Sequence, residues 1–121
     1  MTGTSASTES AKDPSVLVSG VISNMWYNGE LNLFPASEYG KSNPDMSNFS
    51  GWGHFSQVVW KGTTQVGCAT HYCKTGTPMF PSRTSGWYTV CNYKQAGNMG
   101  GAYGTNVLKP LGKAVVKPVM P

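Results

Sequence analysis

Charged side chains are scarce in this sequence: they make up 12% of its 121 residues, about half the share of a typical soluble domain. No apolar run is long enough to span a membrane, and no basic stripe with interleaved aromatic residues points to nucleic acid. Residues 1–15 lack the basic start and apolar core of a signal peptide. We therefore expect neither a membrane span nor nucleic-acid binding, and the length is that of one domain.

Cysteine is sparse as well, and its odd count leaves one thiol over: the three are Cys68, Cys73 and Cys91. Cys73 and Cys91 lie in two runs that we expect to pair as antiparallel strands, so a disulfide between them is feasible. Closing that loop would contribute about 3 kcal/mol, and Cys68 would then be left over. Low charge with a disulfide favours a secreted protein, in which the sequon Asn48-Phe49-Ser50 would fit a surface loop.

Local patterns predict a few regular elements. A helix is expected from Asp13-Pro14, a good cap and first-turn pair, through about Leu31. A short helix is expected over 54–60, because Phe55, Val58 and Val59 recur at i, i+3 and i+4. Two strand-like runs follow at 65–73 and 87–93.

The remaining segments read as irregular. Residues 1–12 are small and polar and predict a flexible lead-in, whereas 109–121 carry three prolines and predict an extended tail. Residues 34–52 form a loop whose length is unusual unless it is functional. This loop and the residue that follows His54 carry five rings, any of which could either pack in the core or meet an apolar ligand: Phe34, Tyr39, Phe49, Trp52 and Phe55.

Two stretches of the sequence are distinctive: GHFSQVVW (53–60) followed by QVGCA, and YTVCNYKQAGN (88–98). They resemble the two signatures of the CAP superfamily of cysteine-rich secretory proteins, antigen 5 and pathogenesis-related proteins of class one, and in particular its fungal members, with Ala96 where proline is usual. The likeness runs from about Trp26 to Leu108. It implies an α+β fold, the α-β-α sandwich with an antiparallel sheet.

The family's opening segments, a His-Asn-x-x-Arg helix and a Gly-Glu-Asn stretch, have no counterpart here. We therefore expect residues 13–108 to form an N-terminally truncated CAP domain, an incomplete sandwich that lacks the first helix layer. A sheet face left uncovered in this way would favour self-association or a protein partner.

The resemblance also implies a cavity with two His and two Glu that holds a divalent metal. His54 matches one of these positions; the acid expected three residues after Trp26 is replaced by Gly29, and Glu30 lies about 100° further round a regular helix. Zinc takes three or four ligands, so His54 and Glu30 are weak metal candidates, and no metal or other cofactor is required by the residues present. No catalytic residue is assigned, since Ser56 lies beside His54 without a nucleophile elbow.

The resemblance implies a function for the aromatic loop, because in fungal CAP proteins a loop at this position is implicated in sterol binding. The main hypothesis is accordingly a secreted pathogenesis-related protein that binds a sterol or related lipid through residues 34–55. The alternatives are a metal-dependent hydrolase that uses the remaining His54 and Glu30, and a non-catalytic effector that binds a protein partner.

Overall fold

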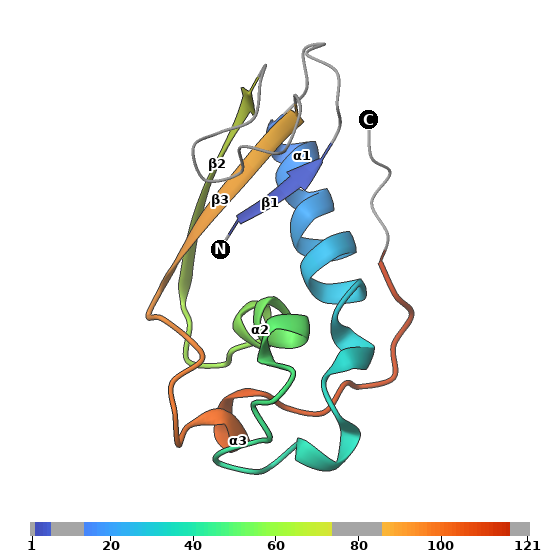
Figure 1. Ribbon diagram of the computed structural model, residues 1–121, viewed down its shortest axis with the longest axis vertical. Coiled ribbons are helices and arrows are strands. Elements are labelled where there is room, and N and C mark those ends of the chain that lie inside the picture. The colour runs from blue at the N-terminus through green and yellow to red at the C-terminus, as the bar shows by residue number, and fades with distance from the viewer. Residues whose placement is uncertain (1, 6–13, 74–85, 117–121) are drawn as a thin grey trace.

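Helices pack against a three-stranded antiparallel sheet in the computed structural model, which describes residues 2–5, 14–73 and 86–116. The strands are β1 (Thr2–Ser5), β2 (Gln65–Cys73) and β3 (Gly86–Lys94), in the order β1-β3-β2. In Figure 1 the first helix lies alongside this sheet. The C-terminal segment, residues 108–116, runs beside the lower part of that helix on the side away from the sheet. The fold is α+β, as expected.

The helical elements follow the chain in short pieces. The first helix comprises α1 (Pro14–Gly20) and a π-helical continuation, η1 (Val21–Asn28). Two single 3₁₀ turns follow, η2 (Leu31–Leu33) and η3 (Ala36–Glu38), and then α2 (Phe49–Val58) and α3 (Tyr103–Asn106). None of the helices in the described residues is long and apolar enough to cross a membrane.

The N-terminal part of the lead-in forms β1, which corrects the prediction of a flexible segment over 1–12. Thr2 pairs with Val90 and Ser5 with Trp87 along the free edge of β3. Backbone N–H and C=O groups make these ladder bonds whatever the side chains are, so small polar residues were no obstacle. The rest of the predicted lead-in, 6–12, lies outside the described residues.

Helix α2 begins at Phe49, five residues before the helix expected over 54–60, and includes Gly51 and Gly53. Glycine weakens helices, but here the packing compensates. Trp52 and Phe55 are buried at the i+3 spacing, and each stabilises the fold by about 1.5–3 kcal/mol. Gly53 is required by its neighbour, because a Cβ there would lie 2.9 Å from the Phe49 ring.

The predicted disulfide is wrong: Cys68 bonds Cys91, and the two residues face each other directly in the ladder between β2 and β3. Cys73 instead lies opposite Gly86, five positions along the ladder from Cys91 and therefore about 17 Å from it. The pairing of strands was predicted correctly, but their register was not, and the register decides which cysteines meet.

Most of the buried apolar side chains in the described residues fall into two clusters. One surrounds the disulfide and joins the first helix to the sheet through Val21, Trp26 and Cys91. The other lies at the end of α2, distant from the sheet, and consists mostly of aromatic side chains: Phe34, Trp52, Phe55, Trp60, Tyr103 and Val107.

Candidate functional site

His54 and Glu30 form a polar pair between α2 and the end of the first helix. Nδ1 of His54 lies 2.9 Å from one Glu30 oxygen, and the other oxygen accepts hydrogen bonds from the backbone N–H groups of His54 (3.0 Å) and Phe55 (3.1 Å). The Trp26 ring stacks on the imidazole at 5.3 Å between centroids, with 5° between planes. The Trp26 and Glu30 side chains, four residues apart, are thus fixed against His54, which lies 24 residues beyond Glu30.

The π-helical form of η1 explains how Glu30 reaches this position. A π-helix bonds i to i+5 and so takes more residues per turn than an α-helix. Because η1 is π-helical and ends at Asn28, a step of 100° per residue does not carry from Trp26 to Glu30, which lies two residues beyond the helix. The sequence argument assumed regular helical geometry and placed Glu30 about 100° away; the structure brings Glu30 and His54 together.

The pair does not amount to a metal centre. A zinc site needs three or four donors from one cavity, and the described residues contain no cluster of three His, Cys, Asp or Glu side chains that could hold an ion. Both Glu30 oxygens already have hydrogen-bonding partners in His54 and Phe55. The arrangement fits a carboxylate that braces α2, and we derive no metal-dependent step from it.

Ser56 belongs to a second polar network, which joins the two signature stretches. Its fully buried hydroxyl lies 2.5 Å from Oδ1 of Asn98 and 3.0 Å from the carbonyl of Gly53, and Nδ2 of Asn98 donates to the same carbonyl at 2.9 Å. Asn98 adopts a positive φ of 57°, which asparagine tolerates better than most residues. Ser56 therefore fixes the turn after β3.

Gln57 extends this network along α2. Its Oε1 accepts the backbone N–H of Gly97 at 2.7 Å, and its Nε2 donates to the Thr63 hydroxyl at 3.0 Å. A Cβ at position 97 would lie 2.7 Å from the Gln57 amide, so this close approach needs glycine.

The five candidate rings are mostly packed against each other. Phe34, Trp52 and Phe55 are buried, and Tyr39 packs against them partly buried. Phe34 lies at the centre, with ring centroids 4.7 Å from Tyr39, 4.8 Å from Trp52 and 5.9 Å from Phe55. Phe49 is the exposed member, at 36%, and meets Trp52 edge-on at 5.2 Å. The rings form a connected cluster with Phe49 at its outer edge.

A buried acid, which the sequence analysis did not single out, holds the aromatic loop in place. Glu38 is 8% exposed; it accepts the Asp45 backbone N–H at 2.6 Å and pairs with Lys41 at 2.6 Å. The Lys41 ammonium and the Asp45 N–H hold the pKa of the Glu38 carboxyl below its ordinary value. The one sequence signal was the spacing of Glu38 and Lys41 at i and i+3, which is common on surfaces.

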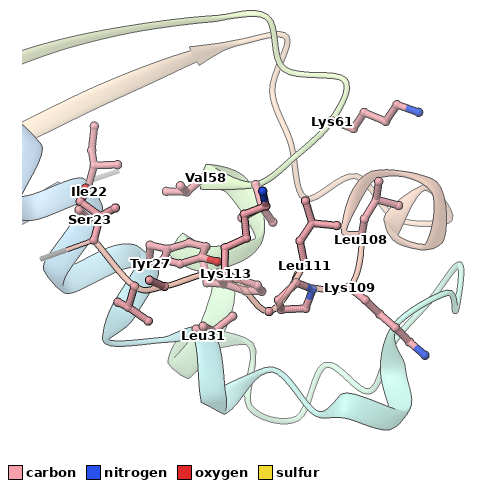
Figure 2. A pocket seen from close by; sticks show the side chains of 17 residues that line it. Ile22, Ser23, Tyr27, Leu31, Val58, Lys61, Leu108, Lys109, Leu111 and Lys113 are labelled. Carbon is pink, nitrogen blue, oxygen red and sulfur yellow. The ribbon is translucent and has the colours of Figure 1, made fainter.

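A cavity of about 780 Å³ lies between the first helix, α2 and the C-terminal segment. Its volume falls within the range of small-molecule sites, about 300–1,000 Å³. Figure 2 shows Tyr27 and Leu31 on one side of it and Leu111 on another, with Lys61 and Lys109 directed away. The walls consist mainly of apolar side chains from three elements: Ile22, Tyr27, Leu31, Phe55, Val58 and Val59, with residues 108–116 opposite them.

The C-terminal segment forms one wall of this cavity, and the sequence did not indicate that. Residues 109–116 contain neither helix nor strand, and they lie against η1. Nδ2 of Asn28 donates to the carbonyl of Val116 at 2.7 Å. Of the five candidate rings, Phe55 lines the cavity. The Phe55 ring packs against the rings of Phe34 and Tyr27.

Fold and site therefore describe a small α+β domain with a disulfide-braced sheet, an aromatic core and an apolar cavity. The model of the CAP family, described as the cysteine-rich secretory protein family, matches residues 4–93. The chain belongs to this family.

Fungal proteins are among its relatives. It is 45% identical over 102 residues to a probable pathogenesis-related protein of Arthroderma benhamiae, a match that covers 82% of this chain and 31% of the relative. It is 40% identical to protein PRY2 of Saccharomyces cerevisiae over 69% of this chain and 20% of that one. Secreted protein RBT4 of Candida albicans is 39% identical over 49% of this chain and 17% of its own. The chain thus spans less than a third of each.

Proposed function

We propose that this protein is secreted and binds a sterol or a related lipid. The observation that carries the proposal is the cavity of about 780 Å³, whose walls are largely apolar and include an aromatic ring of the core. A site of this size could cover most of a rigid, flat ligand. Secretion is supported by the Cys68–Cys91 disulfide, which is typical of oxidising compartments, and by a relative that is named a secreted protein.

The side chains at the cavity suit a ligand with one polar end. Leu31, Phe55 and Val58 offer apolar surface, and covering an apolar side chain is worth about 1.5–3 kcal/mol. Tyr27 also lines the cavity and adds a phenolic hydroxyl, which can donate to or accept from a ligand hydroxyl. Several such contacts would offset the cost of fixing a ligand in place.

A ligand would enter the cavity by displacing the C-terminal segment that forms one of its walls. Leu111 and Val116 are 86% and 71% exposed, so this wall leaves much of its own apolar surface in water. It lacks regular secondary structure over the described residues 109–116. A ligand that covers these side chains would draw the segment inward and close the site. The role first given to the loop over 34–55 is thereby divided: Phe55 meets the ligand, and the buried Phe34 and Trp52 support it from the core.

Equilibrium binding of a radiolabelled sterol to the purified chain tests the proposal. We expect saturable binding in the micromolar range. Ala114→Trp, which places a bulky side chain into the wall of the cavity, should weaken binding by at least tenfold. The matched control is Ala36→Trp, at an exposed residue of η3 away from the cavity. Absence of saturable binding at micromolar sterol would refute the proposal, and equal binding by both variants would refute the location.

A second candidate function, binding of a protein partner, is favoured by the outer face of the sheet. Residues alternate across β2 and β3, so Thr89 and Cys91 are buried against the helices, whereas Ala69, His71 and Val90 are exposed on the other face. A sheet covered on one side in this way suits a partner or a second copy of the chain on the other.

A further inference from the structure

Asn48 begins the one Asn-x-Ser/Thr tripeptide in this sequence, Asn48-Phe49-Ser50, which is the acceptor motif for N-linked glycosylation. The other asparagines lack serine or threonine two positions on; Asn43, for example, is followed by Pro44 and Asp45. The inference rests on the proposed secretion, which the Cys68–Cys91 disulfide supports because disulfides are typical of oxidising compartments, where this modification is made. Sequence and compartment therefore agree.

The structure presents this tripeptide at the surface. Residues 45–50 are all exposed, and Asn48 is the residue before the first turn of α2. In a helix this position usually directs its side chain back to cap the free N–H groups, but Asn48 makes no such side-chain bond. The amide is therefore not committed to holding the helix, and its modification would leave α2 intact.

The Asn48 amide lies close to the backbone of Gly51, three residues further along in the first turn of α2. A Cβ built on Gly51 would lie 2.7 Å from Nδ2 of Asn48, so any other residue at 51 would crowd the amide. The Gly51 backbone N–H donates to the Asn48 carbonyl at 2.9 Å and forms a turn. The turn holds Asn48 and Ser50 together at the surface.

The neighbours of Asn48 give a glycan a physical role. Met46 and Phe49 flank it and are 45% and 36% exposed. These two apolar side chains sit beside the modification point, and a glycan is bulky, hydrophilic and solubilising. A sugar on Asn48 would cover this edge of the aromatic cluster and limit its association with other apolar surfaces.

We infer that Asn48 carries an N-linked glycan in the secreted protein. The reaction is transfer of an oligosaccharide from a lipid diphosphate donor by a host oligosaccharyltransferase. Nδ2 of Asn48 forms a bond to the anomeric carbon of the sugar, the carbon–oxygen bond to the diphosphate breaks, and the lipid diphosphate leaves with that electron pair. The amide proton passes to a base of the transferase. Asn48 is not among the residues that line the cavity, so the inference stands apart from lipid binding.

The test uses the full chain secreted behind a leader peptide from a fungal host and recovered from the medium. Peptide N-glycosidase F should increase its gel mobility and, in heavy-oxygen water, convert Asn48 to labelled aspartate. The tryptic peptide from Ser42 to Lys61 also holds Asn43, which serves as an internal control and should stay unlabelled. Tandem mass spectrometry of this peptide tells the two positions apart.

Substitutions separate the modification from folding. Ser50→Ala keeps Asn48 but removes the hydroxyl of the acceptor motif, and it should abolish the mobility change, as should Asn48→Gln. Ser50→Thr restores the motif and should keep the glycan. Secreted wild-type chain that carries no glycan, or a glycan that persists in Ser50→Ala, would overturn the inference.

Discussion

The Glu30 carboxylate ties together two stretches of chain, since its oxygens meet the backbone N–H groups of His54 and Phe55 and the imidazole of His54. The contact spans the boundary between the first helix and α2, where the aromatic cluster begins. Its three hydrogen bonds brace the N-terminal half of this contact against α2. In the present chain, therefore, the polar pair supports the apolar site.

We predict that Glu30→Ala lowers the free energy of unfolding by at least about 2 kcal/mol, because it removes three hydrogen bonds and one bond to a charged group is worth about 1.5–3 kcal/mol. Glu30→Gln keeps one carbonyl oxygen as an acceptor and should lose about half as much. Urea denaturation of the three proteins measures both. If Glu30→Ala is as stable as wild type, the carboxylate does not brace α2.

A second acid makes stability depend on pH. The folded-state pKa of Glu38 is lowered from its ordinary value of 4.5 by Lys41 and the Asp45 N–H. Its stabilising contribution is therefore complete above 4.5 and is lost as the pH falls through the folded-state value.

Glu38→Gln should thus flatten the fall in unfolding free energy below pH 4.5, because the amide does not titrate. Urea titrations at neutral pH and at several acid values, run on both proteins, measure the difference. Asp45, whose pKa is also lowered, is present in both, so its contribution cancels in the comparison. If the unfolding free energies of the two proteins fall equally steeply below pH 4.5, the pKa of Glu38 is not lowered in the folded state.

At the scale of elements, the π-helical η1 ends at Asn28, and the acid that meets His54 lies two residues beyond it. Gly29 ends this element at a close approach: a Cβ there would lie 2.5 Å from the Met25 carbonyl oxygen. A backbone oxygen cannot move aside as a flexible side chain can. The backbone at the end of the π-helical η1 therefore requires glycine at position 29.

Gly29→Ala should destabilise the protein by about 1–3 kcal/mol, as overpacking does, although helix propensity alone predicts a gain of about 1 kcal/mol. The sign of the change is the test. Gly67→Ala is the matched control, because Gly67 lies in β2 with nothing within 4 Å of its added Cβ, and it should be neutral or gain about 0.5 kcal/mol. Thermal and urea unfolding report both; a stabilised Gly29→Ala would contradict the wide-turn geometry.

The register of β2 against β3 predicts which cysteine can be removed without loss of the disulfide. Cys68→Ser should break the bond and cost about 3 kcal/mol, from the loop of 23 residues that it closes. Cys73→Ser should leave the bond and the unfolding free energy unchanged. Alkylation without reduction, followed by peptide mass spectrometry, identifies the free thiol; loss of the disulfide in Cys73→Ser would refute the register.

Elements that depend on local sequence could be predicted, and those that depend on distant contacts could not. Pro14 begins the first helix and residues 65–73 form a strand as expected, since caps and alternation are local signals. The start of α2 was misplaced because burial of Trp52 outweighs the glycines around it. The disulfide partner of Cys91 was misassigned because register is set by the pairing of whole strands.

The candidate site shows the same division. His54 was found because the stretch around it resembles a family motif. Its contact with Glu30 could be recognised only from the actual backbone geometry at the end of the first helix. The cavity could not be predicted at all, because one of its walls is the tail, whose position against η1 is a long-range contact of residues 108–116. Glu38 was missed because a single acid in a polar loop gives no sign that it will be buried.

At the scale of the whole molecule, the outer face of the sheet is the proposed surface for a partner or a second copy. Val90→Lys places a charge on this face, where Val90 is 46% exposed. If the face self-associates, the weight-average mass of the wild type rises with concentration in sedimentation velocity, and Val90→Lys suppresses the rise. Asn32→Lys adds the same charge at an exposed residue of η2 and should have no effect. An invariant wild-type mass would exclude self-association here.

The central claim, that a lipid occupies the cavity beneath the C-terminal segment, is tested most directly by photo-crosslinking. A photoactivatable sterol is irradiated with the purified chain, and the labelled residues are mapped by tandem mass spectrometry. The account predicts saturable labelling, competed by unlabelled sterol, at Tyr27 to Leu31 and at residues 108–116, which face each other across the cavity. Labelling confined to the exposed edge around Met46 and Phe49, or labelling that does not saturate, would contradict it.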